Sequence, residues 1–348
     1  MVITDPDGRI DILSLEKSEL VKIIMDMGEK KFRANQIFEW LHVKNIDSFS
    51  QMTNLSAQLR DKLETKFCLK SLFVCKRLES STDNTVKYLY RLSDGNHIES
   101  VLMEYSYGNT ICVSTQVGCK MGCRFCASTI AGYKRDLLPS EILGQIYTAQ
   151  RDSGRKISGV VLMGIGEPLD NYDNVIQFLK LLSCPDGFAM SLRHVSLSTC
   201  GLVPRIYELA ELELGITLSV SLHAPDDASR SAVMPINNRY GVAELMQACH
   251  YYFEKTGRRI SFEYALINGH NDSREDAQRL AGLLGGFVCH VNIIPVNKIK
   301  ERGYSSDRRS AHRFQRYLDE LGINATVRRT LGCLLYTSPS PRDYAASR

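Results

Sequence analysis

The stretch CVSTQVGCKMGCRFCAS, residues 112–128, concentrates the residues of this 348-residue chain whose types and spacing could support chemistry. Cys119, Cys123 and Cys126 follow the spacing C-x3-C-x2-C, and Cys112 stands about one strand length upstream. Three thiolates in one short loop can bind zinc or an iron–sulfur cluster. The glycines and cations between them make the loop polar and turn-rich, which argues against three inert core cysteines.

The number of ligands separates the two kinds of metal site. Structural zinc usually has four protein ligands, whereas this loop offers one C-x2-C pair, one further cysteine and no nearby histidine. A ferredoxin-type cluster would need a fourth cysteine in register. Three ligands leave one iron of a [4Fe–4S] cluster open to a substrate or cofactor. The sequence therefore favours an open-site [4Fe–4S] cluster on Cys119, Cys123 and Cys126, and a zinc-binding structural module remains the alternative.

The elements that position this loop follow a regular rhythm after residue 110. Six strand-like runs alternate with helical stretches: TICVSTQV, ISGVVLMG, HVSLST, ITLSVSLHA, RISFEYALI and HVNIIPV. Alternating strands and helices indicate an α/β fold with a parallel sheet. A closed barrel needs eight such units, so six predict a partial (βα)6 TIM-like barrel. Polar residues stand where each predicted strand ends, which is where barrels of this kind place their active sites.

Three further segments surround this predicted core of residues 106–332. Residues 1–70 show helical periodicity and predict a small N-terminal helical domain. Residues 71–105 alternate apolar and polar side chains around Asp94-Gly95, which predicts an antiparallel β-ribbon leading into the core. Residues 333–348, CLLYTSPSPRDYAASR, have the composition of a flexible tail or of foreign sequence joined to a truncated reading frame.

Composition limits the class of protein. The N-terminus lacks an apolar signal segment and no apolar run approaches the ~20 residues of a membrane span, so we expect a soluble, cytoplasmic protein with no membrane partner. Eleven cysteines, an odd number, argue against a disulfide framework. A net charge of +4 permits an RNA partner without demonstrating one. Local basic clusters comprise Lys22, Lys30, Lys31 and Arg33, and Lys298, Lys300, Arg302, Arg308, Arg309 and Arg313.

The cysteine loop, with Phe125 before its last cysteine, resembles the signature of the radical S-adenosylmethionine superfamily. A narrower resemblance runs from about residue 14 to Gly332, to the RlmN-type adenine C2 methyltransferases of ribosomal and transfer RNA. It is carried by FRANQIFEWLH, MTNLS, IESVLM, CVSTQVGCKMGCRFC, MGIGEPLDNYDNV, LSTCGLVP, SLHAPDD and MPINNRY. The resemblance implies a [4Fe–4S] cluster whose open iron binds S-adenosylmethionine and cleaves it to a 5′-deoxyadenosyl radical.

The same resemblance implies roles for individual residues. Gly166 and Glu167 would hold the methionine end of S-adenosylmethionine. The rest of that pocket would be lined by Ser198, Ser221, Leu222, His223 and Asn297. Glu99 would accept the proton lost from C2 of adenine, and Cys112 would resolve a covalent protein–RNA intermediate by forming a disulfide with a C-terminal cysteine.

The C-terminal cysteine is where the chain departs from the family. After VRRTLG the family continues to A-A-C-G-Q-L, whose cysteine would fall near position 339, where this chain has Pro339. Cys333 is six residues early. Two alternatives therefore stand beside the C2 methyltransferase: a C8 methyltransferase of the same family, and a catalytically incomplete iron–sulfur RNA-binding protein. The resemblance also implies a flavodoxin- or ferredoxin-type electron donor and a monomer.

Overall fold

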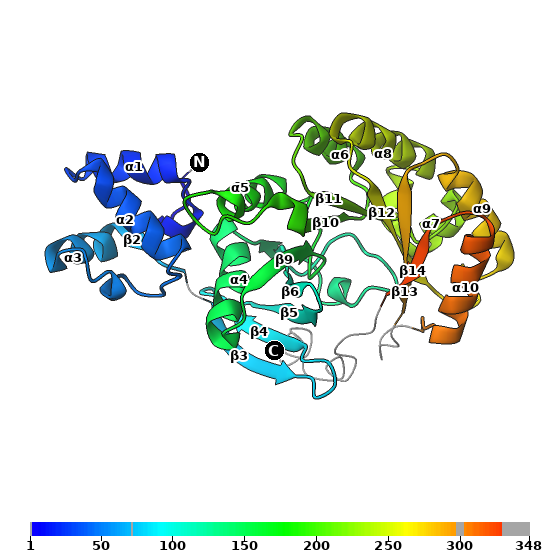
Figure 1. The fold of residues 1–348 in the computed structure, drawn as a ribbon, viewed down its shortest axis with the longest axis horizontal. Coiled ribbons are helices and arrows are strands. Elements are labelled where there is room, and N and C mark those ends of the chain that lie inside the picture. Colours follow the sequence, from blue (N-terminus) through cyan, green and yellow to red (C-terminus); the bar gives the residue numbers. More distant parts are fainter. Residues whose placement is uncertain (1, 71, 297–302, 329–348) are drawn as a thin grey trace.

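The computed structural model describes residues 2–70, 72–296 and 303–328, and its core is a single large sheet (Figure 1). In the described residues the sheet has ten strands in the order β14-β13-β12-β11-β10-β9-β6-β5-β4-β3. Its parallel part comprises β6 (Gly108–Cys112), β9 (Ile157–Leu162), β10 (Val195–Thr199), β11 (Thr217–Ser221), β12 (Ile260–Leu266), β13 (Cys289–Pro295) and β14 (Ala325–Val327).

Helices follow the parallel strands and cover the outer face of the curved sheet (Figure 1). They are α4 (Pro139–Ser153), α5 (Tyr172–Ser183), α6 (Val203–Glu211), α7 (Asp227–Val233), α8 (Val242–Thr256), α9 (Arg274–Leu284) and α10 (Arg308–Glu320). The predicted α/β partial barrel is confirmed. The structure adds the parallel strand β14, which has only three residues and is too short to be predicted from its sequence pattern.

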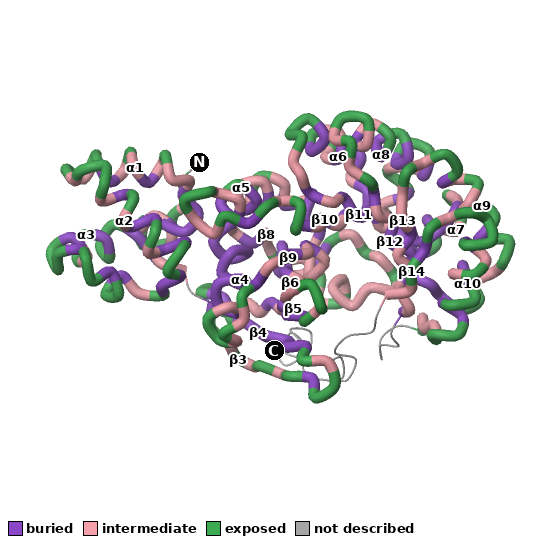
Figure 2. Tube along the Cα trace, in the orientation of Figure 1, coloured by how far each residue is buried: buried purple, intermediate pink, exposed green. Residues whose placement is uncertain are grey.

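Alternation along the strands decides which side chains face each side of the sheet. In β10, Val195 and Leu197 are fully buried against the outer helices, whereas Ser196 and Ser198 are half-buried on the other face. Figure 2 shows this burial running through the strands and the inward sides of the helices. The concave face of the sheet is therefore polar, as a ligand-binding lumen requires.

Residues 73–105 form three strands that continue the main sheet. They are β3 (Phe73–Glu79), β4 (Val86–Arg91) and β5 (His97–Tyr105), all antiparallel. β5 also pairs with β6, with Val101 opposite Cys112. Side chains on the ribbon can therefore share a face with the first strand of the parallel part.

The N-terminal residues form the expected helical unit. It contains α1 (Lys17–Asp26), α2 (Lys31–His42) and α3 (Ala57–Lys66), and it is closed by β1 (Ile10–Asp11) pairing with β2 (Phe67–Cys68). No helix in the described ranges is long and apolar enough to cross a membrane.

Buried polar contacts attach this unit to α4 of the core. The Asp11 carboxylate accepts a hydrogen bond from the Ser140 hydroxyl at 2.5 Å. The Asn45 amide donates to the Tyr147 carbonyl at 3.0 Å, and the His42 ring lies 2.9 Å from the Tyr147 hydroxyl. Because these groups are buried, water competes weakly for their hydrogen bonds, which fix the unit against α4.

Candidate active site

A short two-stranded antiparallel sheet closes the cysteine loop. β7 (Gln116–Val117) pairs with β8 (Arg135–Asp136), and the Lys134 amide donates to the Val117 carbonyl at 2.8 Å. Gly118 at the start of the loop has a φ of +75°, and a Cβ there would lie 1.7 Å from the carbonyl oxygen of Gly132. Glycine is therefore required at position 118 for the loop to close.

The three cysteines lie together within this loop. Cys119 is buried, and Cys123 and Cys126 are half-buried. Burial raises the pKa of Cys119 to about 12, and it also raises the pKa of Cys123. The charge of the neighbouring thiolates raises both pKa values further. Any metal that binds these thiols must therefore displace their protons.

These donors are the thiolate type that iron–sulfur clusters use as ligands. Among the described residues, no three histidine, cysteine or acidic side chains converge tightly enough to hold a single metal ion. A [4Fe–4S] cluster distributes its cysteine ligands over separate iron atoms, so it accepts thiols that are neighbours without meeting at one point. Cys119, Cys123 and Cys126, spaced along one closed loop, fit that requirement.

A small apolar cluster joins the loop to the ends of several strands. Its buried members are Cys200, Val233, Met234, Ala265, Ile267 and Val296. Met121, Cys123 and Phe125 of the loop pack against it. The Arg124 amide also donates to the Val233 carbonyl at 2.9 Å. The loop is therefore held against the carboxyl ends of β10, β12 and β13.

Glu167, which follows β9, is buried at 4% exposure. Its carboxylate accepts hydrogen bonds from the amides of Leu169 at 3.0 Å and Cys200 at 2.7 Å. Burial raises the pKa of Glu167, while these hydrogen bonds oppose the rise. Each oxygen has two lone pairs, so the carboxylate can still accept from a ligand. Gly166 (φ +111°) packs against Gln116, where a Cβ would lie 2.6 Å from the Gln116 Cβ.

The remaining described pocket residues end β10 and β11. Ser198 and Ser221 are half-buried, and Leu222 is fully buried. His223 has a φ of +60°, a strained conformation for a residue other than glycine. Its Nδ1 accepts from the Ala265 amide at 2.8 Å. The bend brings His223 back over the end of β12.

His223 also contacts the cysteine loop. Its ring meets Phe125 edge to face, with ring centroids 4.9 Å apart. Burial, with a smaller contribution from the charge of Arg230, lowers the pKa of His223 to about 3. Because Nδ1 accepts a hydrogen bond, the neutral ring carries its proton on Nε2. His223 is therefore a neutral donor at physiological pH.

Arg230 was missed by the sequence analysis. It is fully buried on α7 and donates to the carbonyls of Cys200, Ser221 and Leu222 at 2.7, 3.1 and 3.1 Å. A fourth bond reaches the Asn237 side chain at 2.9 Å. One cation therefore holds the chain after β10 and the chain after β11 together. The sequence gives no signal for this, because its acceptors are backbone carbonyls.

Glu99 and Cys112 lie on one face of the sheet, at the junction of ribbon and barrel. Cys112 is opposite Val101, and Glu99 is two residues from Val101 along β5. The Glu99 carboxylate lies 2.9 Å from the Lys87 ammonium on β4, with both side chains largely buried. Burial raises the pKa of the Cys112 thiol, and the nearby Arg328 charge opposes this rise. Lys87 has no motif that marks it in the sequence.

Several predicted features lie outside the described residues. They are the candidate pocket residue Asn297, Cys333, Pro339, and the remainder of the predicted tail at 333–348. Lys298, Lys300 and Arg302 of the second basic cluster lie outside as well.

Family models match both parts of the chain. Residues 10–69 match the model described as the ribosomal RNA large subunit methyltransferase N-terminal domain. Residues 113–281 match the radical SAM superfamily. The two matches correspond to the helical unit and to the part of the barrel that carries the cysteine loop.

Individual proteins match over nearly the full length. A probable dual-specificity RNA methyltransferase RlmN from Lachnospira eligens is 52% identical over 323 residues, 92% of each chain. Its counterpart from Lachnoclostridium phytofermentans is 50% identical and covers 93% of this chain and 91% of its own. The crystal structure of a radical SAM methyltransferase from Sphaerobacter thermophilus superposes with a TM-score of 0.89 at 40% identity, covering 92% of this chain and 96% of that one.

Proposed function

Because the chain belongs to the RlmN family of radical S-adenosylmethionine RNA methyltransferases, we propose that it methylates C2 of adenosine in large-subunit ribosomal RNA and in transfer RNA. The observation that carries this proposal is the match of both parts of the chain at once. The radical SAM barrel alone would leave the substrate open, but residues 10–69 match a domain named for ribosomal RNA methylation. The general activity, RNA methylation, is common to the matched relatives.

Cys119, Cys123 and Cys126 would hold a [4Fe–4S] cluster. Glu167, Ser198, Ser221, Leu222 and His223, together with Gly166 and Asn297, would bind S-adenosylmethionine beside it. When bound, this pair of cofactors supplies a methyl group and the radical that activates it. Glu167 would accept from the ammonium group as a charge-assisted hydrogen bond. Phe125 and His223 support the proposal, since their contact couples the cysteine loop to the predicted pocket.

Glu99 would act as the base. Joining a carbon to C2 of adenine leaves a hydrogen on that atom, and a base must remove it as a proton. The Lys87 ammonium, 2.9 Å away, favours the ionised carboxylate that can accept this proton. The pair supports a catalytic role for Glu99 more than its sequence context alone does.

Cys112 would complete the reaction. Its thiolate would attack the sulfur of a second cysteine that joins protein to RNA through a methylene bridge. The new S–S bond forms as the C–S bond breaks, the C–S electron pair moves to the methylene carbon, and a proton completes the methyl group. Cys333 is the one cysteine that follows Cys289 in this sequence, and its position differs from the family pattern.

The partners are proposed on the same basis. The N-terminal helical unit would dock ribosomal or transfer RNA, and a flavodoxin- or ferredoxin-type protein would supply electrons. We further propose that the enzyme acts as a monomer in the cytoplasm.

The test uses anaerobically reconstituted protein, S-adenosylmethionine, dithionite and RNA transcripts, followed by digestion, mass spectrometry and NMR. We expect 2-methyladenosine from a chain whose residues after Gly332 carry the family segment A-A-C-G-Q-L in its usual register. Formation of 8-methyladenosine would overturn the C2 assignment. The same assay is run on the unaltered chain and on the chain that carries A-A-C-G-Q-L. If both form 5′-deoxyadenosine but no methylated RNA, the result would support the catalytically incomplete RNA-binding protein instead.

A further inference from the structure

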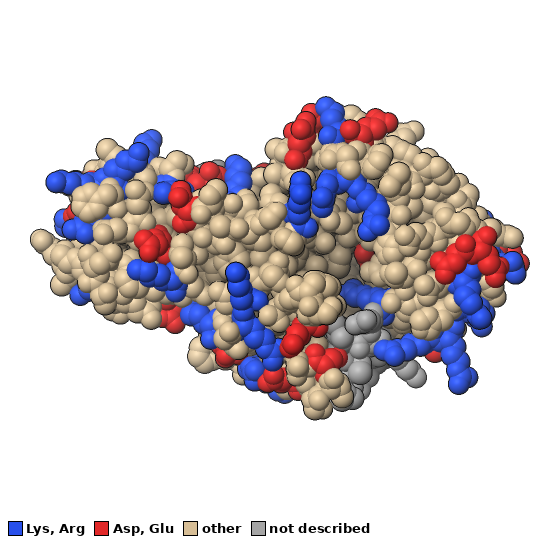
Figure 3. Space-filling view, viewed as in Figure 1, with Lys and Arg blue, Asp and Glu red and all other residues tan. Residues whose placement is uncertain are grey.

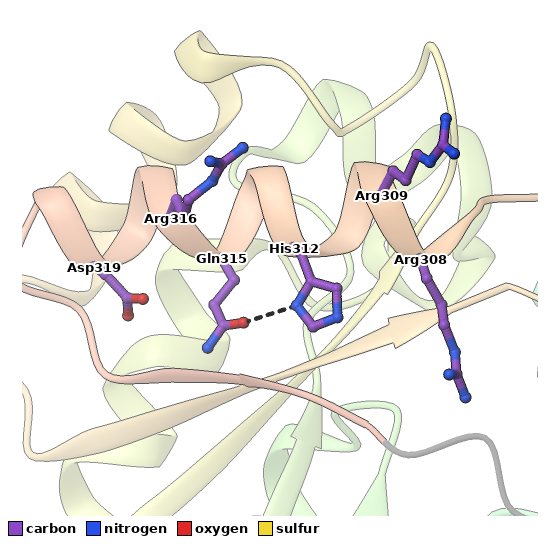
Figure 4. Close-up of a pocket in the computed structure, with 6 residues that line it drawn as sticks. All are labelled: Arg308, Arg309, His312, Gln315, Arg316 and Asp319. Carbon is purple, nitrogen blue, oxygen red and sulfur yellow. Dashed lines mark hydrogen bonds between the residues drawn. The ribbon is translucent and has the colours of Figure 1, made fainter.

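Helix α10 (Arg308–Glu320) presents a basic face away from the core. It is capped by Asp307, whose carboxylate accepts from the Ser310 amide at 2.7 Å. Ala311, Phe314 and Leu318 are fully buried against the barrel. The exposed side carries Arg308, Arg309, His312 and Arg316 (Figure 4). The apolar stripe fixes the helix, so the cations on its other side do not contribute to holding it in place.

The guanidinium groups of Arg308, Arg309 and Arg316 have no carboxylate partner within 4.0 Å in the described part of the chain. Some arginines elsewhere do have one. The pairs include Arg155 with Glu79, Arg205 with Glu208, Arg274 with Glu320 and Arg279 with Asp226. Three uncompensated charges on one helix therefore create a local positive potential that paired arginines would not. Figure 3 shows basic side chains gathered over this part of the surface.

These arginines border a shallow, open depression on the exposed face of the helix. His312, Gln315 and Asp319 complete its lining. In Figure 4 the His312 ring and the Gln315 amide lie side by side, joined by a 3.3 Å hydrogen bond, and Arg308 extends beside them. Asp319 is the one acid of the lining and stands at the far end. The end near Arg308 therefore combines positive charge with polar donors.

Hydrogen bonds place that end at the mouth of the barrel. Val296, which directly follows β13, exchanges bonds with Ser306: its amide donates to the Ser306 hydroxyl at 2.8 Å, and its carbonyl accepts from the Ser306 amide at 3.1 Å. Tyr304 packs against the same apolar cluster as Cys123 and Phe125 of the cysteine loop. The helix thus begins at the carboxyl ends of the strands, where the candidate active site lies.

We propose that Arg308, Arg309 and Arg316 bind the phosphate backbone of the substrate RNA beside the active-site mouth, as a contact surface separate from the N-terminal helical unit. This inference rests on the RNA methyltransferase function proposed above. Guanidinium groups bind phosphate oxygens in bidentate fashion, and such contacts position a nucleic acid without reading its sequence. A base that enters the mouth has its own phosphates at the rim, so a cationic rim fits a polynucleotide strand.

Binding of a fluorescent transfer RNA transcript, measured by anisotropy over 50–300 mM salt, tests the proposal. The variant replaces Arg308, Arg309 and Arg316 with glutamine. Its matched control replaces Arg155, Arg205 and Arg274 with glutamine. This control removes the same number of positive charges, but from arginines that form ion pairs with carboxylates. We expect the variant to weaken binding at least tenfold at low salt. The slope of log Kd against log salt should fall by about 2–3, since each of the three lost phosphate contacts lowers it by ~0.7–0.9. The control should bind like the parent chain.

Equal affinities and slopes in variant and parent would overturn the proposal. Equal losses of affinity in variant and control would also overturn it, because net charge alone would then explain the effect. Absence of RNA binding by the parent chain would also overturn it. The proposed function is tested separately by measuring the rate of S-adenosylmethionine cleavage in the absence of RNA. That readout should be unchanged in both variants, because neither set of arginines belongs to the candidate cofactor pocket. Circular dichroism of each variant confirms folding.

Discussion

The Lys87 ammonium lies 2.9 Å from the Glu99 carboxylate, across the two adjacent strands β4 and β5. Lys87 is 7% exposed at its side chain and Glu99 is 17% exposed, so water screens the pair weakly. Their position on the ribbon next to Cys112 of β6 places a charged pair beside the barrel lumen. The structure therefore pairs this carboxylate with a cation at the place where the proposed proton acceptor lies.

Replacing Lys87 with methionine should destabilise the fold. It would leave the Glu99 carboxylate buried without its cation, which costs on the order of 3 kcal/mol. The double replacement of Lys87 and Glu99 with methionine should recover most of this loss, because both charges are then removed. Urea unfolding of the single and double variants measures the effect. A single variant as stable as the parent chain would show that the pair contributes little.

Replacing Arg230 with methionine should loosen the chain after β10 and β11. Four hydrogen bonds from a buried cation are lost, and we expect a decrease of about 3 kcal/mol in the free energy of unfolding. Arg205→Met is the control, because its pair with Glu208 is exposed and such pairs contribute ~0–1 kcal/mol. Iron content after reconstitution should fall only in the Arg230 variant. Equal stability of the two variants would contradict the organising role of Arg230.

Acid should destabilise the protein through its buried histidines. Burial lowers the pKa of both His42 and His223 to about 3, whereas an unfolded histidine titrates near 6.5. Below pH ~6.5 the unfolded chain therefore binds protons that the folded chain rejects. Each histidine contributes stability that is complete above pH ~6.5 and falls by up to ~1.4 kcal/mol per pH unit as the pH drops toward 3.

His42→Asn isolates one of these contributions. Asparagine can keep the bond to the Tyr147 hydroxyl but does not titrate. Between pH 6 and 4, the variant should therefore take up about one proton fewer on unfolding than the parent chain. Its unfolding free energy should then depend less steeply on pH, by about 1.4 kcal/mol per pH unit. If the His42 variant kept the parent slope, His42 would have to titrate normally in the folded protein.

The Cys112 thiol should react slowly at neutral pH. Burial raises its pKa, so the reactive thiolate fraction is small at pH 7 and should keep growing beyond pH 9. Mass spectrometry of iodoacetamide labelling should show Cys112 lagging well behind the exposed Cys75 at pH 7, with a rate that climbs steadily with pH. Labelling of both thiols at the same rate at pH 7 would contradict a raised pKa of the half-buried Cys112 thiol.

Local sequence patterns were sufficient to predict the barrel strands and the cysteine loop. Apolar runs bounded by polar residues mark β9 to β13, and the cysteine spacing lies within one loop. Features that depend on register were not predictable. Lys87 meets Glu99 only through antiparallel pairing of β4 and β5, and Arg230 binds carbonyls that every residue carries. The strained backbone at His223 likewise arises from tertiary packing, since histidine itself has no preference for that conformation.

Production of 5′-deoxyadenosine shows directly whether Cys119, Cys123 and Cys126 form a radical-generating cluster site. The reconstituted chain is incubated with S-adenosylmethionine and dithionite, beside Cys123→Ala and the exposed-thiol control Cys75→Ala. We expect four irons per chain and 5′-deoxyadenosine in the parent and in the Cys75 variant, and neither in the Cys123 variant. A parent chain that takes up no iron, or a Cys123 variant that cleaves S-adenosylmethionine as well as the parent, would contradict the account.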